Sequence, residues 1–151
     1  MKHLILFSVA ALSLTACRND DDNSSTEPSI VGTWKLSKGN IYDGKTNKLI
    51  ETDTYDECES KSNTTLSADG KFVTINYTSD YNNQCVSENI SGTYSYNAAN
   101  KKLVSTINGE KDESTVRNLT STELEVDNGE RIDINGDGVQ DVITTVLTRV
   151  K

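Results

Sequence analysis

The chain has 151 residues, with 15 Lys and Arg against 23 Asp and Glu, and its net charge is −8. The length suits a single domain. The acidic balance excludes nucleic acid as a partner, because phosphate recognition needs clustered basic side chains. It also argues against attachment to anionic lipid through charge.

The first 16 residues read as a leader rather than as part of the domain. Lys2 gives a basic start, and the apolar run from Leu4 to Leu14 is too short to span a membrane. The sequence Leu14-Thr15-Ala16-Cys17 resembles the lipobox of bacterial lipoproteins. The resemblance implies that residues 1–16 are a lipoprotein signal peptide and that Cys17 carries the lipid. An ordinary secretory signal is the alternative.

Residues 17–29 are expected to form an acidic, disordered tether before a domain over 30–151. From residue 18 to 29 the only apolar side chain is the ring of Pro28, too little to offset the ordering entropy. The run Asp20-Asp21-Asp22 resembles an export signal of outer-membrane lipoproteins, and a plain charged linker explains it equally well. We expect a lipid anchor in the cell outer membrane, with the domain on the periplasmic or the surface-exposed face.

From Ile30 onward the apolar side chains alternate with a period of two, which predicts strands and an all-β fold. Turn sequences such as Asp69-Gly70 and Asn108-Gly109 separate the alternating runs. Strands are predicted near 31–38, 47–54, 60–67, 71–78, 89–96, 102–108, 112–119, 122–127, 130–134 and 141–150. About eight to ten short sequential strands favour an antiparallel up-and-down β-barrel, which leaves no exposed sheet edge.

Several short motifs, taken in order, resemble those of lipocalins. Val31-Gly32-Thr33-Trp34 is similar to the Gly-x-Trp opening strand of that family. The runs 66–72, 90–94 and 102–104 follow in the order found in the lipocalin-like domain of small bacterial lipoproteins. The resemblance covers about residues 30 to 150 and implies a barrel that binds a small hydrophobic or amphipathic ligand.

Every second side chain of a predicted strand points into the barrel, and these positions give a set of candidate ligand-binding residues. Its members are Trp34, Leu36, Ile75, Tyr77, Tyr94, Tyr96 and Val146. Trp34 has the largest apolar surface in the set, and a plug in the core is the role that a strand residue at this position more often has.

Cys58 and Cys85 remain once Cys17 is assigned to the lipid. An even pair in an exported protein is expected to form a disulfide, with two free thiols as the alternative. A zinc site is disfavoured because the only histidine, His3, lies in the leader.

The segment from Asp133 to Asp141 resembles the first nine positions of an EF-hand calcium loop. Calcium would be the cofactor, held by the residues Asp133, Asn135, Asp137, Val139 (through its carbonyl) and Asp141. The bidentate glutamate of that loop is missing, which predicts weak binding. The same segment also reads as an ordinary hairpin turn.

The sequence favours a protein that is not an enzyme. Without His3 the chain has no Ser-His or Cys-His pair, and no glycine-rich phosphate loop is present. We therefore expect a lipid-anchored, lipocalin-like ligand binder. The competing hypothesis is a solid barrel that acts as a protein-binding module or an enzyme inhibitor at the cell surface, similar to small barrel lipoproteins that inhibit lysozyme.

Overall fold

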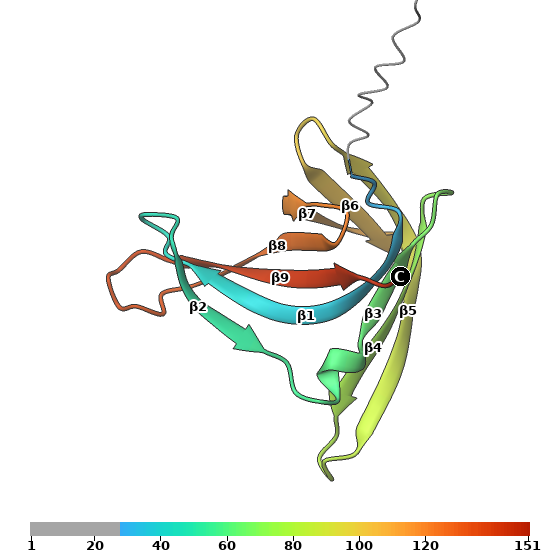
Figure 1. Cartoon of the computed structure of the whole chain (residues 1–151), viewed down its shortest axis with the longest axis horizontal. Coiled ribbons are helices and arrows are strands. Elements are labelled where there is room, and N and C mark those ends of the chain that lie inside the picture. Colours follow the sequence, from blue (N-terminus) through green and yellow to red (C-terminus); the bar gives the residue numbers. More distant parts are fainter. Residues whose placement is uncertain (1–27) are drawn as a thin grey trace, which may run out of the picture.

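The computed structural model describes residues 28–151, and Figure 1 shows the chain as strands wrapped around one axis. The predicted leader, Cys17 and most of the predicted tether lie outside the described residues. A short 3-10 helix, η1 (Glu59–Lys61), precedes the third strand. The strands are β1 (Gly32–Tyr42), β2 (Leu49–Thr54), β3 (Asn63–Leu66), β4 (Lys71–Ser79), β5 (Cys85–Asn97), β6 (Lys102–Ile107), β7 (Glu110–Leu119), β8 (Glu123–Ile132) and β9 (Asp141–Arg149).

The sheet closes because its first and last strands pair. β1 is antiparallel to β9 along one edge, from Trp34 opposite Arg149 to Tyr42 opposite Val142. From β3 to β9 each strand pairs with the next one in sequence, and β3 returns to β1. The result is the closed antiparallel barrel of eight strands that the sequence predicts.

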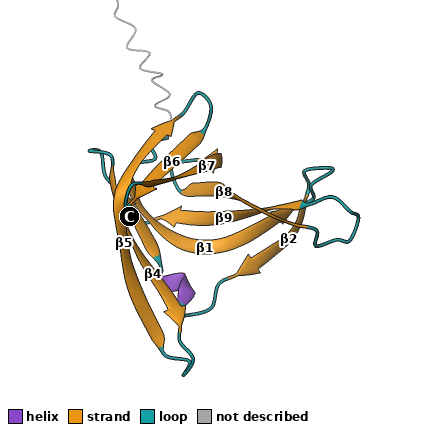
Figure 2. Ribbon diagram, turned by 180° about the vertical axis from the view of Figure 1, so that it is seen from behind, coloured by secondary structure: helices purple, strands orange, loops and turns teal. Residues whose placement is uncertain are grey.

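β2 is a strand but not a member of the ring. It pairs with Lys38–Tyr42 of β1, while β3 pairs with residues 32–35 on the same edge of β1. In Figures 1 and 2, β2 and β3 accordingly follow different stretches of β1. All six residues of β2 are exposed, so its unpaired edge faces solvent.

Two strand predictions need correction. The strands expected at 122–127 and 130–134 are one strand, β8, because residues 127–129 form a bulge instead of a hairpin turn. The pairing of β8 with β9 shifts between Asp127 and Arg131, and Gly129 has a φ of 85°. The strand expected at 60–67 begins as η1, because the Asp56 carboxylate accepts hydrogen bonds from the N–H groups of Cys58 and Glu59 and turns the chain there.

Buried side chains cluster around Trp34 at one end of the barrel. Trp34 is fully buried, and its indole N–H donates to the Ile30 carbonyl at 2.8 Å. The Arg149 guanidinium lies over the indole ring, 4.0 Å from its centroid, and donates to the carbonyls of Val31 and Ser121. The buried side chains packed there are Ile30, Trp34, Leu66, Phe72, Val116, Leu124 and Val126. We call this the closed end.

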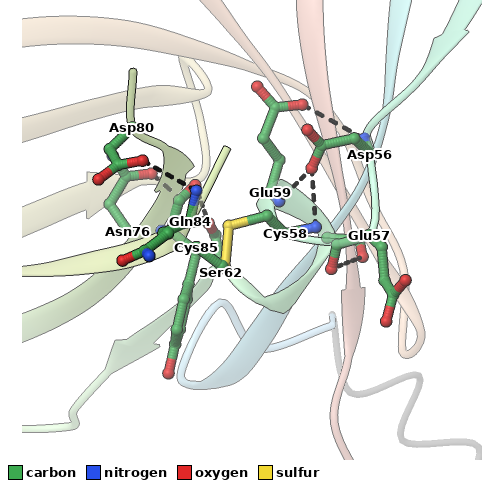
Figure 3. Close-up of a disulfide and its surroundings, with 11 residues drawn as sticks. Asp56, Glu57, Cys58, Glu59, Ser62, Asn76, Asp80, Gln84 and Cys85 are labelled. Carbon is green, nitrogen blue, oxygen red and sulfur yellow. Dashed lines mark hydrogen bonds between the residues drawn. A yellow bond between two sulfur atoms is a disulfide. The ribbon is translucent and has the colours of Figure 1, made fainter. Parts of the chain in front are cut away.

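Cys58 and Cys85 form the predicted disulfide, with their Cα atoms 5.5 Å apart. It ties the segment before η1 to the first residue of β5 (Figure 3). In the chain-entropy model, closing a loop of this length contributes about 3–4 kcal/mol to stability. The bond therefore holds in place the only helical turn among the described residues.

Candidate ligand-binding cavity

The barrel contains a cavity of about 430 Å³ that is open to solvent, with Trp34 among its lining residues. Most of the lining is apolar or aromatic. These residues are Trp34, Leu66, Phe72, Ile90, Tyr94, Leu103, Ile107, Leu124, Val126 and Leu147. The volume lies within the range of about 300–1,000 Å³ that is usual for small-molecule sites.

The apolar wall is built by strand alternation. On β5, Ile90 and Tyr94 point inward and pair across from Thr74 on β4 and Ser105 on β6. Gly92 lies between them, where a Cβ would meet the Thr106 carbonyl oxygen and the Phe72 ring. The glycine therefore lets β5 and β6 bend closely around the Phe72 side chain.

Tyr94 is fixed in this wall by its hydroxyl, which donates to the Ser67 carbonyl at 2.9 Å. Burial raises the pKa of Tyr94, and the nearby Asp69 carboxylate adds to the rise. The phenol is therefore neutral at physiological pH and offers an aromatic face to the cavity.

A smaller set of the lining residues is polar. It comprises Thr64, Thr74, Ser105, Asp112, Ser114, Asn128 and Thr145. Ser114 donates a hydrogen bond to the side-chain oxygen of Asn128 at 3.4 Å. Asp112 is the only charged residue in the lining. On β7 it lies four residues from Val116 of the closed end, about 13 Å along the strand.

Tyr55, in the connection between β2 and η1, lies beside one member of this polar set. Its hydroxyl lies 3.8 Å from where a Cβ of Gly39 would stand, and it shares a hydrogen bond with Thr145, a cavity residue. Burial raises the pKa of Tyr55, and the hydrogen bond with Thr145 opposes the rise. Sequence reasoning missed this contact, because it joins segments that are distant along the chain.

The structure brings only part of the predicted ligand-binding set to the cavity. Trp34 and Tyr94 line it. Tyr96 and Leu36 are half-buried, and Tyr96 packs against the core at the closed end.

The inward parity predicted for Ile75, Tyr77 and Val146 is wrong. Thr74 lines the cavity, so its neighbour Ile75, and Tyr77 two residues on, belong to the outer face of β4. Val146 lies between the lining residues Thr145 and Leu147 and also faces outward. Phe72 identifies the inner face of β4, because it is buried and lies two residues before Thr74, on the same face of the strand.

Sequence reasoning also missed the polar members of the lining. The segment from Glu110 to Thr115 contains no apolar side chain, so its sequence does not show which of its side chains point inward. Counting back by two from the buried Val116 would have placed Ser114 and Asp112 on the inner face.

On the outer face, a buried carboxylate connects three strands. Glu125 of β8 is 5% exposed, and one of its oxygens accepts hydrogen bonds from Thr144 at 2.6 Å, Tyr42 at 2.8 Å and Asn40 at 3.1 Å. Burial, followed by the hydrogen bond to Glu125, raises the pKa of Tyr42. Because every partner is a hydrogen-bond donor from β1 or β9, the cluster serves to hold the closing strands together.

Four of the predicted calcium residues lie in the loop between β8 and β9, and the fifth, Asp141, is the first residue of β9. The Asp133 carboxylate accepts hydrogen bonds from the N–H groups of Gly136, Asp137 and Gly138. The Asp141 carboxylate accepts from Gly44 and Ile134. Within residues 28–151 no three His, Cys, Asp or Glu side chains are grouped as metal ligands. Calcium binding stays a prediction.

The comparisons with known proteins agree with this architecture. The family profile described as "Lipocalin-like domain" matches residues 30–126. The chain belongs to the lipocalin-like domain family. No curated relative matches the sequence. Among solved structures, a complex of bovine odorant binding protein with a selenium-containing odorant aligns with a TM-score of 0.42 and 10% identity, over 80% of this chain and 69% of that one.

The lipocalin-like fold fits the binding of a small hydrophobic ligand in the barrel. In the described part of the chain, no helix is long and apolar enough to cross a membrane.

Proposed function

We propose that this protein is a lipid-anchored lipocalin-like lipoprotein of the bacterial outer membrane that binds a small hydrophobic or amphipathic ligand and catalyses no reaction. The observation that carries the proposal is the cavity of about 430 Å³ with a mainly apolar lining. A barrel filled by its own side chains, the basis of the protein-binding alternative, would have no such space. The lipid anchor rests on the sequence around Cys17.

Trp34 provides a direct test, because it is the only tryptophan of the chain and lines the cavity. The neutral probe N-phenyl-1-naphthylamine should bind the purified protein, with energy transfer from Trp34 to the bound probe. Ser105→Phe should abolish this binding, since Ser105 lines the cavity and the larger side chain would fill the space.

The matched control is Val104→Phe, which places the same side chain at the neighbouring position on the opposite face of β6. Both variants should show a cooperative thermal transition close to that of the wild type. Absence of probe binding by the wild type, or equal binding by Ser105→Phe, would contradict a ligand-binding interior and favour the protein-binding alternative. If the probe binds as expected, native mass spectrometry of protein released from its own membrane would identify any ligand that co-purifies.

A further inference from the structure

The lining of the cavity contains one charged residue, Asp112, which is exposed and forms no salt bridge within residues 28–151. Asp112 lines the cavity opposite Ser105, and its carboxylate forms no hydrogen bond or salt bridge with another described residue. Its neighbour Glu113 faces outward and forms a salt bridge with Lys102 at 2.9 Å. The two adjacent carboxylates of β7 therefore differ in that only the outer one has a cation.

Further acidic side chains have inward parity and are exposed, and Lys111 lines a neighbouring surface pocket together with Asp112. Glu110 is opposite the lining residue Ile107, and Glu88 lies two residues before Ile90, on the same face of β5. Asp53 of β2 is opposite Gly39, which is itself paired with the lining residue Thr145. On the described strands, the only basic residue with inward parity is Arg149, which is at the closed end and engaged by carbonyl groups.

An apolar body and a positive head would complement this arrangement. The apolar part of such a ligand would lie against Trp34, Tyr94 and Leu103, and its head would reach the carboxylate of Asp112. A carboxylate or phosphate head would instead meet repulsion from the carboxylate of Asp112.

We infer that the cavity selects amphipathic molecules that carry a protonated amine, with Asp112 as the residue that recognises the amine. The inference rests on the proposed ligand-binding function and specifies its ligand class.

The test is displacement of bound N-phenyl-1-naphthylamine by three molecules that share one alkyl chain: decylamine, decanol and decanoate. At low ionic strength decylamine should displace the probe at a concentration about fivefold lower than decanol, which is the effect of one close charge pair in a water-like medium. Decanoate should be the weakest of the three. Added salt should reduce the difference between amine and alcohol.

Asp112→Asn should remove the preference for the amine, so that decylamine and decanol displace the probe at similar concentrations. Glu113→Gln makes the same change in net charge on the outer face, and this variant should keep the preference. Equal displacement by decylamine and decanol in the wild type would overturn the inference and leave the proposed function intact. An amine preference that survives in Asp112→Asn, or that falls equally in both variants, would overturn the role of Asp112. Failure of the probe itself to bind would refute the proposed function and this inference together.

Discussion

Gly32 illustrates how one residue can determine the packing of the closed end. Its φ is 146°, and a Cβ at this position would lie 2.2 Å from a guanidinium nitrogen of Arg149. Arg149 needs this space in order to lie over Trp34 and donate to the Val31 carbonyl. The Gly-x-Trp sequence therefore joins two requirements, since the glycine makes room for the cation that covers the tryptophan.

We expect Gly32→Ala to destabilise the fold by about 1–3 kcal/mol, because the alanine backbone is strained at this φ and Arg149 must move. The displaced guanidinium should also change the emission of Trp34 in the native state. The measurement is denaturant unfolding followed by tryptophan fluorescence. Gly109→Ala is the control. Its φ is 87° with nothing near the added Cβ, so it should cost about 1 kcal/mol and leave the native emission unchanged. Equal effects on stability and emission in the two variants would contradict this account of Gly32.

Among the elements, the loop between β8 and β9 packs against the turn between β1 and β2. The Gly44 N–H donates to Asp141 at 2.9 Å, and the Asn135 amide donates to Asp43 at 2.9 Å. Both views of the fold show these two connections side by side (Figures 1 and 2). Hydrogen bonding from Thr46, more than any other contact, lowers the pKa of Asp43. The acidic side chains of this region thus already accept backbone and side-chain donors.

Calcium binding by this loop would add to that hydrogen bonding. If Asp133, Asn135, Asp137 and Asp141 bind the ion only in the folded state, calcium at ten times Kd stabilises the fold by about 1.4 kcal/mol. For a domain of this size, the melting temperature should rise by roughly 3–6 °C. Asp137→Ala should remove most of the rise, and magnesium should do less than calcium because it tolerates a flexible oxygen cage poorly. A calcium titration against EGTA measures the shift. No shift at millimolar calcium, or an equal shift in both proteins, would leave the loop as a hydrogen-bonded turn.

The elements of the barrel could be predicted from the sequence where local chemistry determines them. The Asn108-Gly109 turn has φ angles of 52° and 87°, as a two-residue hairpin turn requires. The order of the strands followed from such turns. The inner face of β4 could not be predicted from the sequence. The alternating apolar residues Val73, Ile75 and Tyr77 lie on the outer face, and Phe72 is the first residue of the inner face. The bulge at Gly129 looked like a turn because both need a glycine with positive φ.

At the scale of the whole molecule, closure of the barrel brings the two ends of the domain together. Ile30 precedes β1 and accepts the hydrogen bond of Trp34, so the chain enters the barrel at its closed end. Asp112 and Asn128 line the cavity further along the strands, away from that end. A lipid on Cys17 would therefore tether the protein by the closed end, with Asp112 and Asn128 directed away from the anchor.

The anchor itself is tested by Cys17→Ser. The sequence Leu14-Thr15-Ala16-Cys17 predicts that the thiol of Cys17 accepts the lipid before the leader is cut, so a hydroxyl in its place should stop both steps. Cells that express the variant should accumulate precursor that retains residues 1–16, and labelled fatty acid should be absent from it. The double variant Cys58→Ser/Cys85→Ser removes the other two cysteines and should be labelled and processed as the wild type is, although its fold lacks the disulfide. Gel migration and incorporation of labelled palmitate distinguish the two variants. Normal labelling of Cys17→Ser would show that this chain carries no lipid at that position. The proposed location in the outer membrane would then be wrong as well.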